Sequence, residues 1–196
     1  MTKKRIQRFF EALDRALQTF ADIIVIGASA GTLMGHIRPS IDIDFEIRLK
    51  GGKHLDERQE QIIKEVALQS HLAVNYSENI SRWSMIDFLD YRKTAVAYSK
   101  FGKLNVKLIA PEYWTIGKMA RFSDFDISDI MKIVKIKKLS ADKLIRVWAR
   151  AFQSSDVSLE KGDFKKHVVY FLRYNGKRLW GKLFESDEAL KKYGFL

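Results

Sequence analysis

One short segment limits the fold of this chain more than any other. Over residues 41–48, apolar side chains alternate with charged ones, which is the period of a β-strand with one buried face and one charged face. Just before it, the β-branched run 22–26 ends at Gly27, and residues 30–35 have the composition of a short helix. The pattern predicts a strand, a tight turn, a helix and a second strand in succession.

The rest of the pattern predicts a mixed α/β (α+β) fold whose sheet is flanked by helices and followed by a C-terminal helical lobe. We place a boundary after Lys138, between an α/β domain over 1–138 and a basic helical domain over 139–196. Helices are predicted over 6–20, 55–69, 111–121, 141–152 and 164–184, with one more capped by Ser123, and strands over 83–88, 94–98 and 104–109.

The charge of the chain is concentrated near its C-terminus. The net charge is +11, and residues 131–196 contain 16 Lys and Arg against 7 Asp and Glu. Such a basic segment indicates an anionic partner, of which nucleic acid is the commonest, although a solvated helical face gives the same composition. The chain contains no cysteine, which excludes disulfides and thiolate metal sites, and no long apolar run, so we expect a cytoplasmic protein with no membrane segment.

Two carboxylates on the alternating strand are the strongest chemical signal. Asp42 and Asp44 are two residues apart, so they project from the same face, about 6.6 Å apart along the strand. Paired carboxylates with no thiolate nearby favour Mg²⁺ or Mn²⁺, although many such pairs are simply solvated. Glu46 lies on the same face but farther along the strand, and we expect it to be a surface charge.

The turn before this strand suits a phosphate group. Gly27 permits a tight turn, Ala28 and Ser29 keep the side chains small, and the following helix would direct free N–H groups toward an anion. The segment 27–31 also matches the Gly-x-Ser-x-Gly elbow of serine hydrolases, with Ser29 as nucleophile and His167 as the available base. Only one helix and one strand precede Ser29, which disfavours the hydrolase interpretation.

This order of elements resembles the nucleotidyltransferase superfamily with the DNA polymerase β-like fold, and is most similar to the AbiEii-type toxin nucleotidyltransferases. The first block of resemblance runs from Gly27 through Gly35 to Arg38-Pro39-Ser40-Ile41-Asp42-Ile43-Asp44. The second block comprises Pro111-Glu112-Tyr113, Lys118, Arg121 and Asp126-Ile127-Ser128-Asp129-Ile130, with Phe125 in place of the usual lysine. Together the blocks span roughly residues 23–130, a little more than half of the chain.

The resemblance implies a magnesium-dependent enzyme that transfers a nucleoside monophosphate from a nucleoside triphosphate to an RNA, with tRNA as the first candidate, and that acts as a toxin with an antitoxin protein as partner. It makes Asp42 and Asp44 metal ligands and adds Lys118 and Asp126 to the catalytic set. The nucleotide-binding residues it implies are Gly27, Ala28, Ser29, Arg38, Ser40 and Lys118.

One departure from the family pattern leaves other functions open. Polymerase-like members carry a third carboxylate on a later strand, whereas the predicted strand 104–109 offers Asn105 and Lys107. A catalytically inactive, nucleic-acid-binding protein is therefore the alternative, and transfer to a small molecule is a further one. Aromatic residues interleaved with Lys and Arg in the basic domain could stack on RNA bases or lie in its core: Trp148, Tyr170, Phe171, Tyr174 and Trp180.

Overall fold

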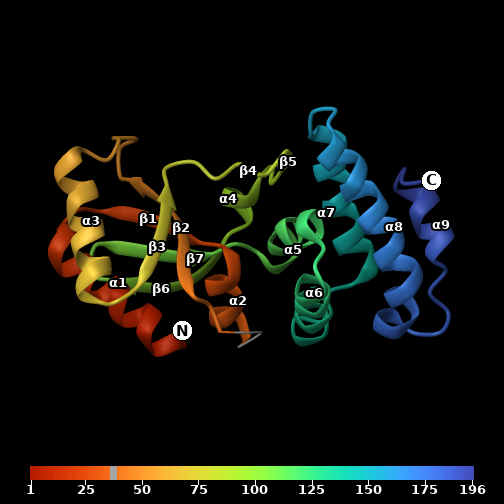
Figure 1. Cartoon of the computed structure of the whole chain (residues 1–196), viewed down its shortest axis with the longest axis horizontal. Helices are drawn as coiled ribbons and strands as arrows, with labels where there is room; N and C mark the ends of the chain where they lie inside the picture. The colour runs from red at the N-terminus through yellow and green to blue at the C-terminus, as the bar shows by residue number, and fades with distance from the viewer. Residues whose placement is uncertain (36–38) are drawn as a thin grey trace. The chain divides into compact units, whose positions relative to one another are not determined.

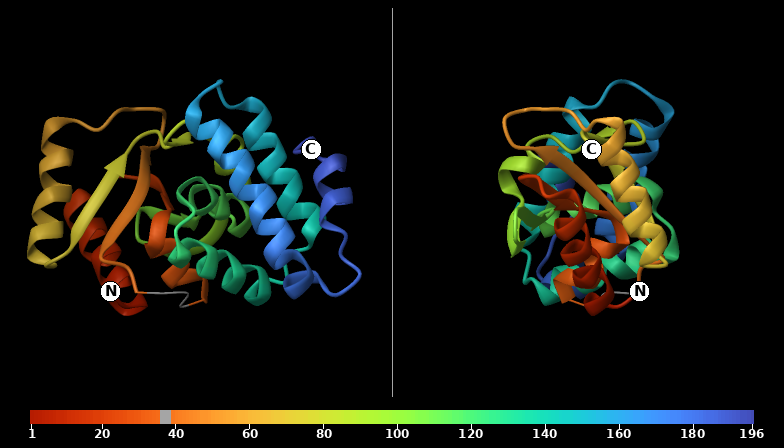
Figure 2. Two further views of the ribbon diagram at one scale, coloured as in Figure 1. Left: turned by 45° about the vertical axis from the view of Figure 1, so that its right-hand side comes forward. Right: turned by 90° about the vertical axis from the view of Figure 1, so that its left-hand side faces the viewer.

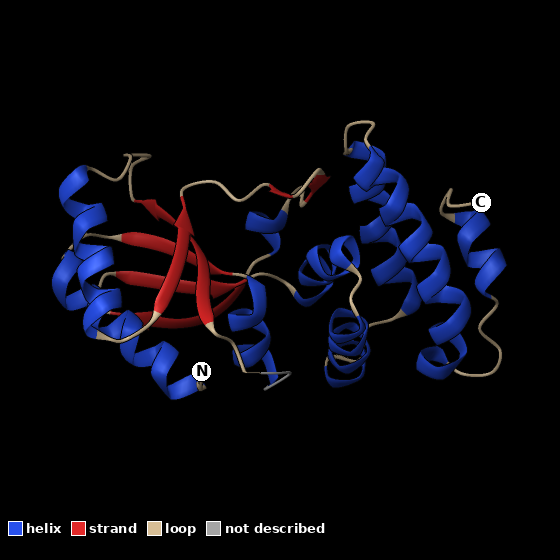
Figure 3. Ribbon diagram, viewed as in Figure 1, coloured by secondary structure: helices blue, strands red, loops and turns tan. Residues whose placement is uncertain are grey.

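The chain folds into two compact units, each of which is described by itself. The computed structural model describes residues 1–35 and 39–196. The sheet unit comprises residues 1–80 and 92–110, and the helical unit comprises residues 81–91 and 111–196. The sheet unit contains the five-stranded sheet, while the helical unit has only one short two-stranded ribbon (Figure 1, Figure 3). None of the described helices is both long and apolar enough to cross a membrane.

The sheet unit is built on a mixed sheet with strand order β3-β2-β1-β7-β6. Strand β1 pairs antiparallel with β2 and parallel with β7, β2 pairs parallel with β3, and β6 forms an antiparallel hairpin with β7. Its elements are α1 (Lys3–Leu17), β1 (Ala21–Val25), α2 (Gly27–Gly35), β2 (Asp42–Leu49), α3 (Glu57–Gln69), β3 (Ala73–Ser77), β6 (Val96–Phe101) and β7 (Leu104–Leu108); the short helix α4 (Tyr91–Thr94) begins at the junction of the units.

Aromatic packing between α1 and β2 forms the centre of this unit. The rings of Phe9 and Phe10 on α1 lie 6.1 and 5.9 Å from the ring of Phe45, and all three side chains are fully buried. Helix α3 packs beside α1 (Figure 2). The helix predicted over 6–20 ends at Leu17, because Gln18 adopts a left-handed conformation that ends the helix, and Phe20 is 53% exposed. The predicted C-terminal end of this helix was therefore wrong.

The helical unit buries its own aromatic core. Trp148 is fully buried, donates a hydrogen bond of 2.9 Å from its indole N–H to Thr115 Oγ1, and meets the ring of Phe171 edge-on. Serines cap three of its helices by accepting a backbone N–H bond. The unit contains β4 (Arg82–Trp83), β5 (Ile86–Asp87), α5 (Pro111–Arg121), α6 (Asp124–Ile136), α7 (Ala141–Ser154), α8 (Leu159–Trp180) and α9 (Ser186–Lys192).

The structure confirms the mixed α/β fold with its C-terminal helices, and several elements differ from the sequence prediction. Strand β3 and helix α9 were not predicted, and α8 begins at Leu159, before the predicted start at residue 164, because Ser158 caps it. The boundary between the two compact units lies before Pro111, whereas the predicted domain boundary follows Lys138. Helices α5 and α6 belong to the helical unit because they pack with the later helices.

Truncation of Phe45 tests the aromatic centre of the sheet unit. We expect Phe45→Ala to lower the free energy of unfolding by about 3–5 kcal/mol, because it leaves a cavity among buried rings. The matched control is Phe20→Ala, which removes the same ring from an exposed site and should cost less than about 1 kcal/mol. Urea unfolding followed by far-UV circular dichroism measures both, and similar losses for the two variants would contradict this packing.

Candidate functional site

The two predicted carboxylates lie together on the same face of β2. Asp42 and Asp44 are both half-buried. The side-chain amide of Asn75, on the neighbouring strand β3, donates to Asp42 Oδ2 at 3.1 Å and to Asp44 Oδ1 at 3.0 Å. A carboxylate oxygen can only accept, so the Nδ2 atom must be the one that faces them. Oxygens from both aspartates therefore converge on one point above the sheet.

The turn at Gly27 is fitted to Asp44. Gly27 has φ of +58°, and a Cβ at this position would lie 2.0 Å from Asp44 Oδ2, so only glycine is compatible with both the backbone conformation and the space. The backbone N–H of Ile26 donates to the Asp44 carbonyl at 2.9 Å. The end of β1, the start of α2 and the start of β2 are thus held in contact with one another.

Ser29 connects the same three elements through its hydroxyl group. It is fully buried, donates to the Ile26 carbonyl at 2.9 Å and accepts from the Asp44 backbone N–H at 3.3 Å. A hydrolase elbow instead exposes the serine Oγ. The expected hydrolase base, His167, donates a hydrogen bond from Nδ1 to the carbonyl of Met119 at 2.9 Å. The serine hydrolase interpretation does not fit these contacts.

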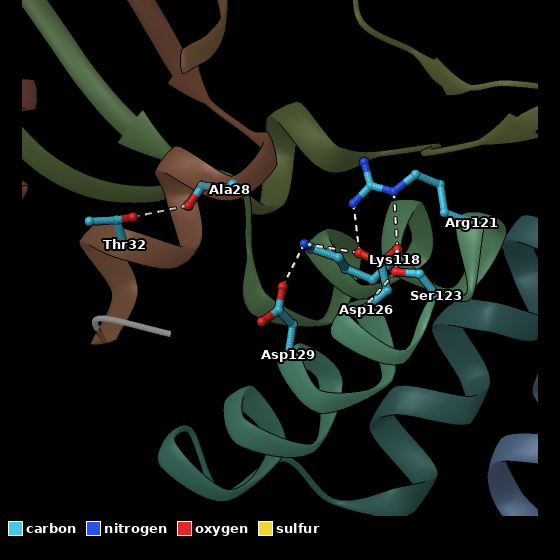
Figure 4. A network of polar contacts seen from close by, with 7 residues as sticks. All are labelled: Ala28, Thr32, Lys118, Arg121, Ser123, Asp126 and Asp129. Atoms are coloured by element: carbon cyan, nitrogen blue, oxygen red, sulfur yellow. Dashed lines mark hydrogen bonds and ion pairs between the residues drawn. The ribbon is translucent and has the colours of Figure 1, made fainter. Parts of the chain in front are cut away.

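Ser40 and Ala28, two other residues predicted to bind the nucleotide, form hydrogen bonds within the sheet unit. Ser40 is buried and donates to the Asp42 carbonyl at 2.5 Å and to Asp42 Oδ1 at 3.4 Å, so it orients the first aspartate. The carbonyl of Ala28 accepts from Thr32 Oγ1 at 3.2 Å within α2 (Figure 4). Arg38 lies outside the described residues.

The donor set at Asp42 and Asp44 is suitable for a hard divalent cation. Its protein ligands would be carboxylate oxygens, which Mg²⁺ and Mn²⁺ prefer. Within the described part of the chain, no three His, Cys, Asp or Glu side chains gather as a metal-binding group. A bound Mg²⁺ would accordingly take two protein ligands and complete its shell with water and phosphate oxygens, as is usual for this ion.

Glu46 is not the surface charge that the sequence predicted. It is 1% exposed and forms a bidentate ion pair with Arg92, at 2.6 and 3.0 Å, and it also accepts from the backbone N–H of Ile80 at 2.9 Å. Burying a carboxylate is tolerated because these donors satisfy it. The partner comes from a segment 46 residues away, which the sequence pattern could not indicate.

The strand beside Asp42 and Asp44 is not the one on which the family pattern would place a third carboxylate. Strand β7, with Asn105 and Lys107, pairs with β1 and not with β2, and Lys107 lies 3.8 Å from Asp22. Strand β3 is the neighbour of β2, and its register places Asn75 opposite Asp44. Sequence reasoning missed Asn75 because it missed β3. An amide therefore occupies this place beside the two carboxylates.

A basic pocket of about 230 Å³ lies farther along the sheet unit. Its lining includes Arg48, Lys50, Arg92 and Lys107, together with the buried Glu46. The register of β1, β2 and β7 puts Arg48 and Lys107 on the sheet face that carries Asp44. This face thus carries Asp42 and Asp44 together with a cluster of cations, of which Arg92 and Lys107 are paired with Glu46 and Asp22.

The second predicted cluster lies in the helical unit. Lys118 on α5 is 2% exposed, and its ammonium contacts Asp129 Oδ2 at 2.7 Å and Asp126 Oδ1 at 3.2 Å on α6 (Figure 4). It also lies 4.8 Å from the centre of the Trp114 ring. Lys118 is therefore a buried, paired lysine and not a solvated residue on the helix surface. Asp129, part of the second block but given no role from the sequence, is its nearest partner.

Asp126 is held in its charged form. Burial by itself raises its pKa, but hydrogen bonds from Arg121 and Ser123 and the charge of Lys118 outweigh burial and lower the pKa from 3.8 to about 2. Arg121 approaches both carboxylate oxygens, at 3.2 and 2.7 Å. Ser123, the predicted cap of α6, both donates to the Asp126 side chain and accepts from its backbone N–H.

Comparisons with models of known protein families, with curated proteins and with solved structures found no match to this chain. The functional interpretation therefore depends on the geometry of these two clusters and on the motifs that the sequence carries.

Substitution of Gly27 tests its close approach to Asp44. We expect Gly27→Ala to lower the free energy of unfolding by at least about 2 kcal/mol, because the methyl group adds a collision to the cost of a positive φ. The matched control is Gly52→Ala, since Gly52 has φ of +73° but no atom within 4 Å of the added Cβ, and it should cost about 1 kcal/mol. Equal losses in urea unfolding would show that Asp44 does not restrict this position.

The low pKa of Asp126 predicts acid sensitivity of the helical unit. The pKa of Asp126 is lower in the folded state than in the unfolded state. Its charged form therefore adds about 2 kcal/mol to the free energy of unfolding above about pH 5, and this contribution is lost as the pH falls toward 2. All four tryptophans lie in the helical unit, so tryptophan fluorescence reports its unfolding. Asp126→Asn should show a loss of stability over this pH range that is smaller by about 2 kcal/mol; an unchanged loss would contradict the charged state proposed for Asp126.

Proposed function

We propose that this protein is a metal-dependent nucleotidyltransferase that transfers a nucleoside monophosphate from a nucleoside triphosphate to an RNA hydroxyl. The observation that carries the proposal is the convergence of Asp42 and Asp44 on one point beside the Gly27 turn. Two carboxylates on one strand next to a helix N-terminus bring a cation-binding group and a phosphate-binding group together. The sequence resemblance to nucleotidyltransferases supports the same reaction.

In this mechanism the hydroxyl oxygen of the acceptor attacks the α-phosphorus of the triphosphate and gives up its proton to water, the bond from that phosphorus to the bridging oxygen breaks, and pyrophosphate leaves. When bound, the divalent cation neutralises the negative charge that develops on the phosphate oxygens. Asp42 and Asp44 would provide the cation ligands. Ser40 orients Asp42, and Asn75 holds the two carboxylates together before the cation binds. The N–H groups at the start of α2 are donors for a phosphate oxygen.

An anionic acceptor is favoured over a small molecule by the charge of the chain. Residues 131–196 carry 16 basic and 7 acidic residues, and the pocket on the carboxylate face is lined by further cations. Polyanions are attracted by such surfaces, and RNA is the acceptor that the family resemblance implies, with tRNA as the first to test. The roles as a toxin and as the partner of an antitoxin stay predictions from the resemblance.

Lys118 as a triphosphate ligand also stays a prediction. Its ammonium is already held by Asp129 and Asp126, so a phosphate oxygen would have to displace one of these carboxylates.

The transfer reaction is tested by incubating the protein with Mg²⁺, labelled nucleoside triphosphates and total RNA. We expect Asp44→Asn to reduce label incorporation by about a hundredfold or more, because it removes a charged cation ligand. The matched control is Glu57→Gln on α3, which removes an exposed carboxylate of the sheet unit that does not line the pocket and should leave incorporation unchanged. Equal incorporation by the Asp44 variant and the unmodified protein would refute the proposed role.

A binding protein without catalysis is the second candidate, and Asn75 is the observation that favours it. An amide beside Asp44 adds no negative charge to the cation site. Calorimetry with Mg²⁺ and each nucleotide separates the two candidates: the enzyme should bind a nucleotide only with Mg²⁺, whereas the binding protein should bind RNA with a steep salt dependence and no nucleotide.

A further inference from the structure

Helix α8 carries two stacked tyrosines on its surface. Tyr170 is 48% exposed and Tyr174 is 70% exposed, although their rings lie 4.2 Å apart at an interplanar angle of 27°. Residues four apart in a helix lie on the same face, so the pair forms a step along α8. Of the aromatic residues that the sequence placed among basic ones, Trp148 and Phe171 are core residues and these two tyrosines are not.

The rings of Phe122 and His167 extend the row of aromatic rings that begins with Tyr174 and Tyr170. Phe122 meets Tyr170 edge-on at 5.8 Å and stacks on His167 at 4.4 Å with an interplanar angle of 9°. His167 is in turn anchored by its Nδ1 atom, which donates to the Met119 carbonyl at 2.9 Å. We call these four residues the aromatic ladder: Phe122, His167, Tyr170 and Tyr174.

Cationic side chains lie on α8 one helical turn from the ladder tyrosines. Lys166, Arg173 and Lys177 are exposed, and each is three or four residues from one of the ladder tyrosines. Each forms an ion pair with an exposed acidic residue: Lys166 with Asp163 at 2.9 Å, Arg173 with Asp187 at 2.9 Å and Lys177 with Glu185 at 3.8 Å. Solvent-exposed ion pairs of this kind contribute little, so a phosphate can compete for these cations.

We propose that the aromatic ladder binds unpaired bases of an RNA, with the neighbouring cations on its phosphates. Exposed rings that alternate with positive charges match a strand in which bases alternate with phosphates. In duplex RNA the faces of the bases are covered by the neighbouring bases. A single-stranded segment is therefore the form of RNA whose bases can stack on the ladder. This inference rests on the proposed function only in identifying that RNA as the acceptor.

Fluorescence anisotropy with a labelled single-stranded RNA, in the absence of divalent cations and nucleotides, tests the ladder. We expect the double variant Tyr170→Ala, Tyr174→Ala to weaken binding about tenfold or more, because stacking on both rings is lost. The double variant with Phe at both positions keeps the rings and should bind like the unmodified protein. Phe125→Ala removes an equally exposed ring from α6 and should also leave binding unchanged.

The same titrations identify the form of the ligand and the role of the cations. RNA annealed to its complement should bind more weakly than the single strand and should be insensitive to the loss of the tyrosines. Replacement of Lys166 and Lys177 by Gln should reduce the dependence of log affinity on log salt concentration by about one for each lysine. Unchanged affinity of the alanine variant, with its circular dichroism spectrum unchanged, would overturn the ladder and leave a protein partner as the explanation for these rings.

The ladder and the transferase proposal can fail separately. If the Asp44→Asn variant and the unmodified protein incorporate label equally, the transferase proposal fails, while RNA binding through the tyrosines is still measured. If the alanine variant binds single-stranded RNA normally, the ladder fails, while label transfer that depends on Asp44 is unaffected.

Discussion

The close approach of the Asp44 carboxylate to the backbone of Gly27 is the constraint on which the sheet unit depends. It requires a glycine at the end of β1, and it is accompanied by hydrogen bonds from Ile26 to Asp44 and from Asp44 to Ser29. These contacts fix the start of α2 against the start of β2. As a result, the helix N-terminus and the carboxylate pair are neighbours because of the fold itself, before any ligand is bound.

A different electrostatic arrangement organises the helical unit. Lys118, Asp126 and Asp129 are buried and Arg121 is exposed; together they contribute two positive and two negative charges, so the cluster is neutral overall. Taking such charges out of water is expensive, and removal of one partner would leave a buried charge uncompensated. The cluster therefore restricts the register of α5 against α6, and it does so whether or not Lys118 ever contacts a phosphate.

The sequence predicted those parts of the fold that depend on local patterns. The alternation that forms β2, the start of α5 at Pro111 and the Ser123 cap were all found where expected. Strand β3 was missed because it is an edge strand whose residues are at most half-buried, so its apolar pattern is weak.

Parts of the candidate site were missed for a related reason, since they depend on contacts between distant segments. The burial of Glu46 requires Arg92, and the contact of Asn75 with Asp42 and Asp44 requires the pairing of β3 with β2. The residues in each of these contacts are too far apart in the sequence for a local pattern to indicate the contact. Asp129 was visible within the second sequence block, but only the packing of α6 on α5 brings it to Lys118.

The role of Asp42 and Asp44 as cation ligands can be measured directly by anomalous diffraction from crystals soaked with Mn²⁺ and a nonhydrolysable nucleoside triphosphate. The proposed function predicts one strong manganese peak at coordination distance from both carboxylates and from the phosphates, with Asn75 displaced from at least one of the two. An ordered triphosphate with its manganese bound away from Asp42 and Asp44 would contradict it.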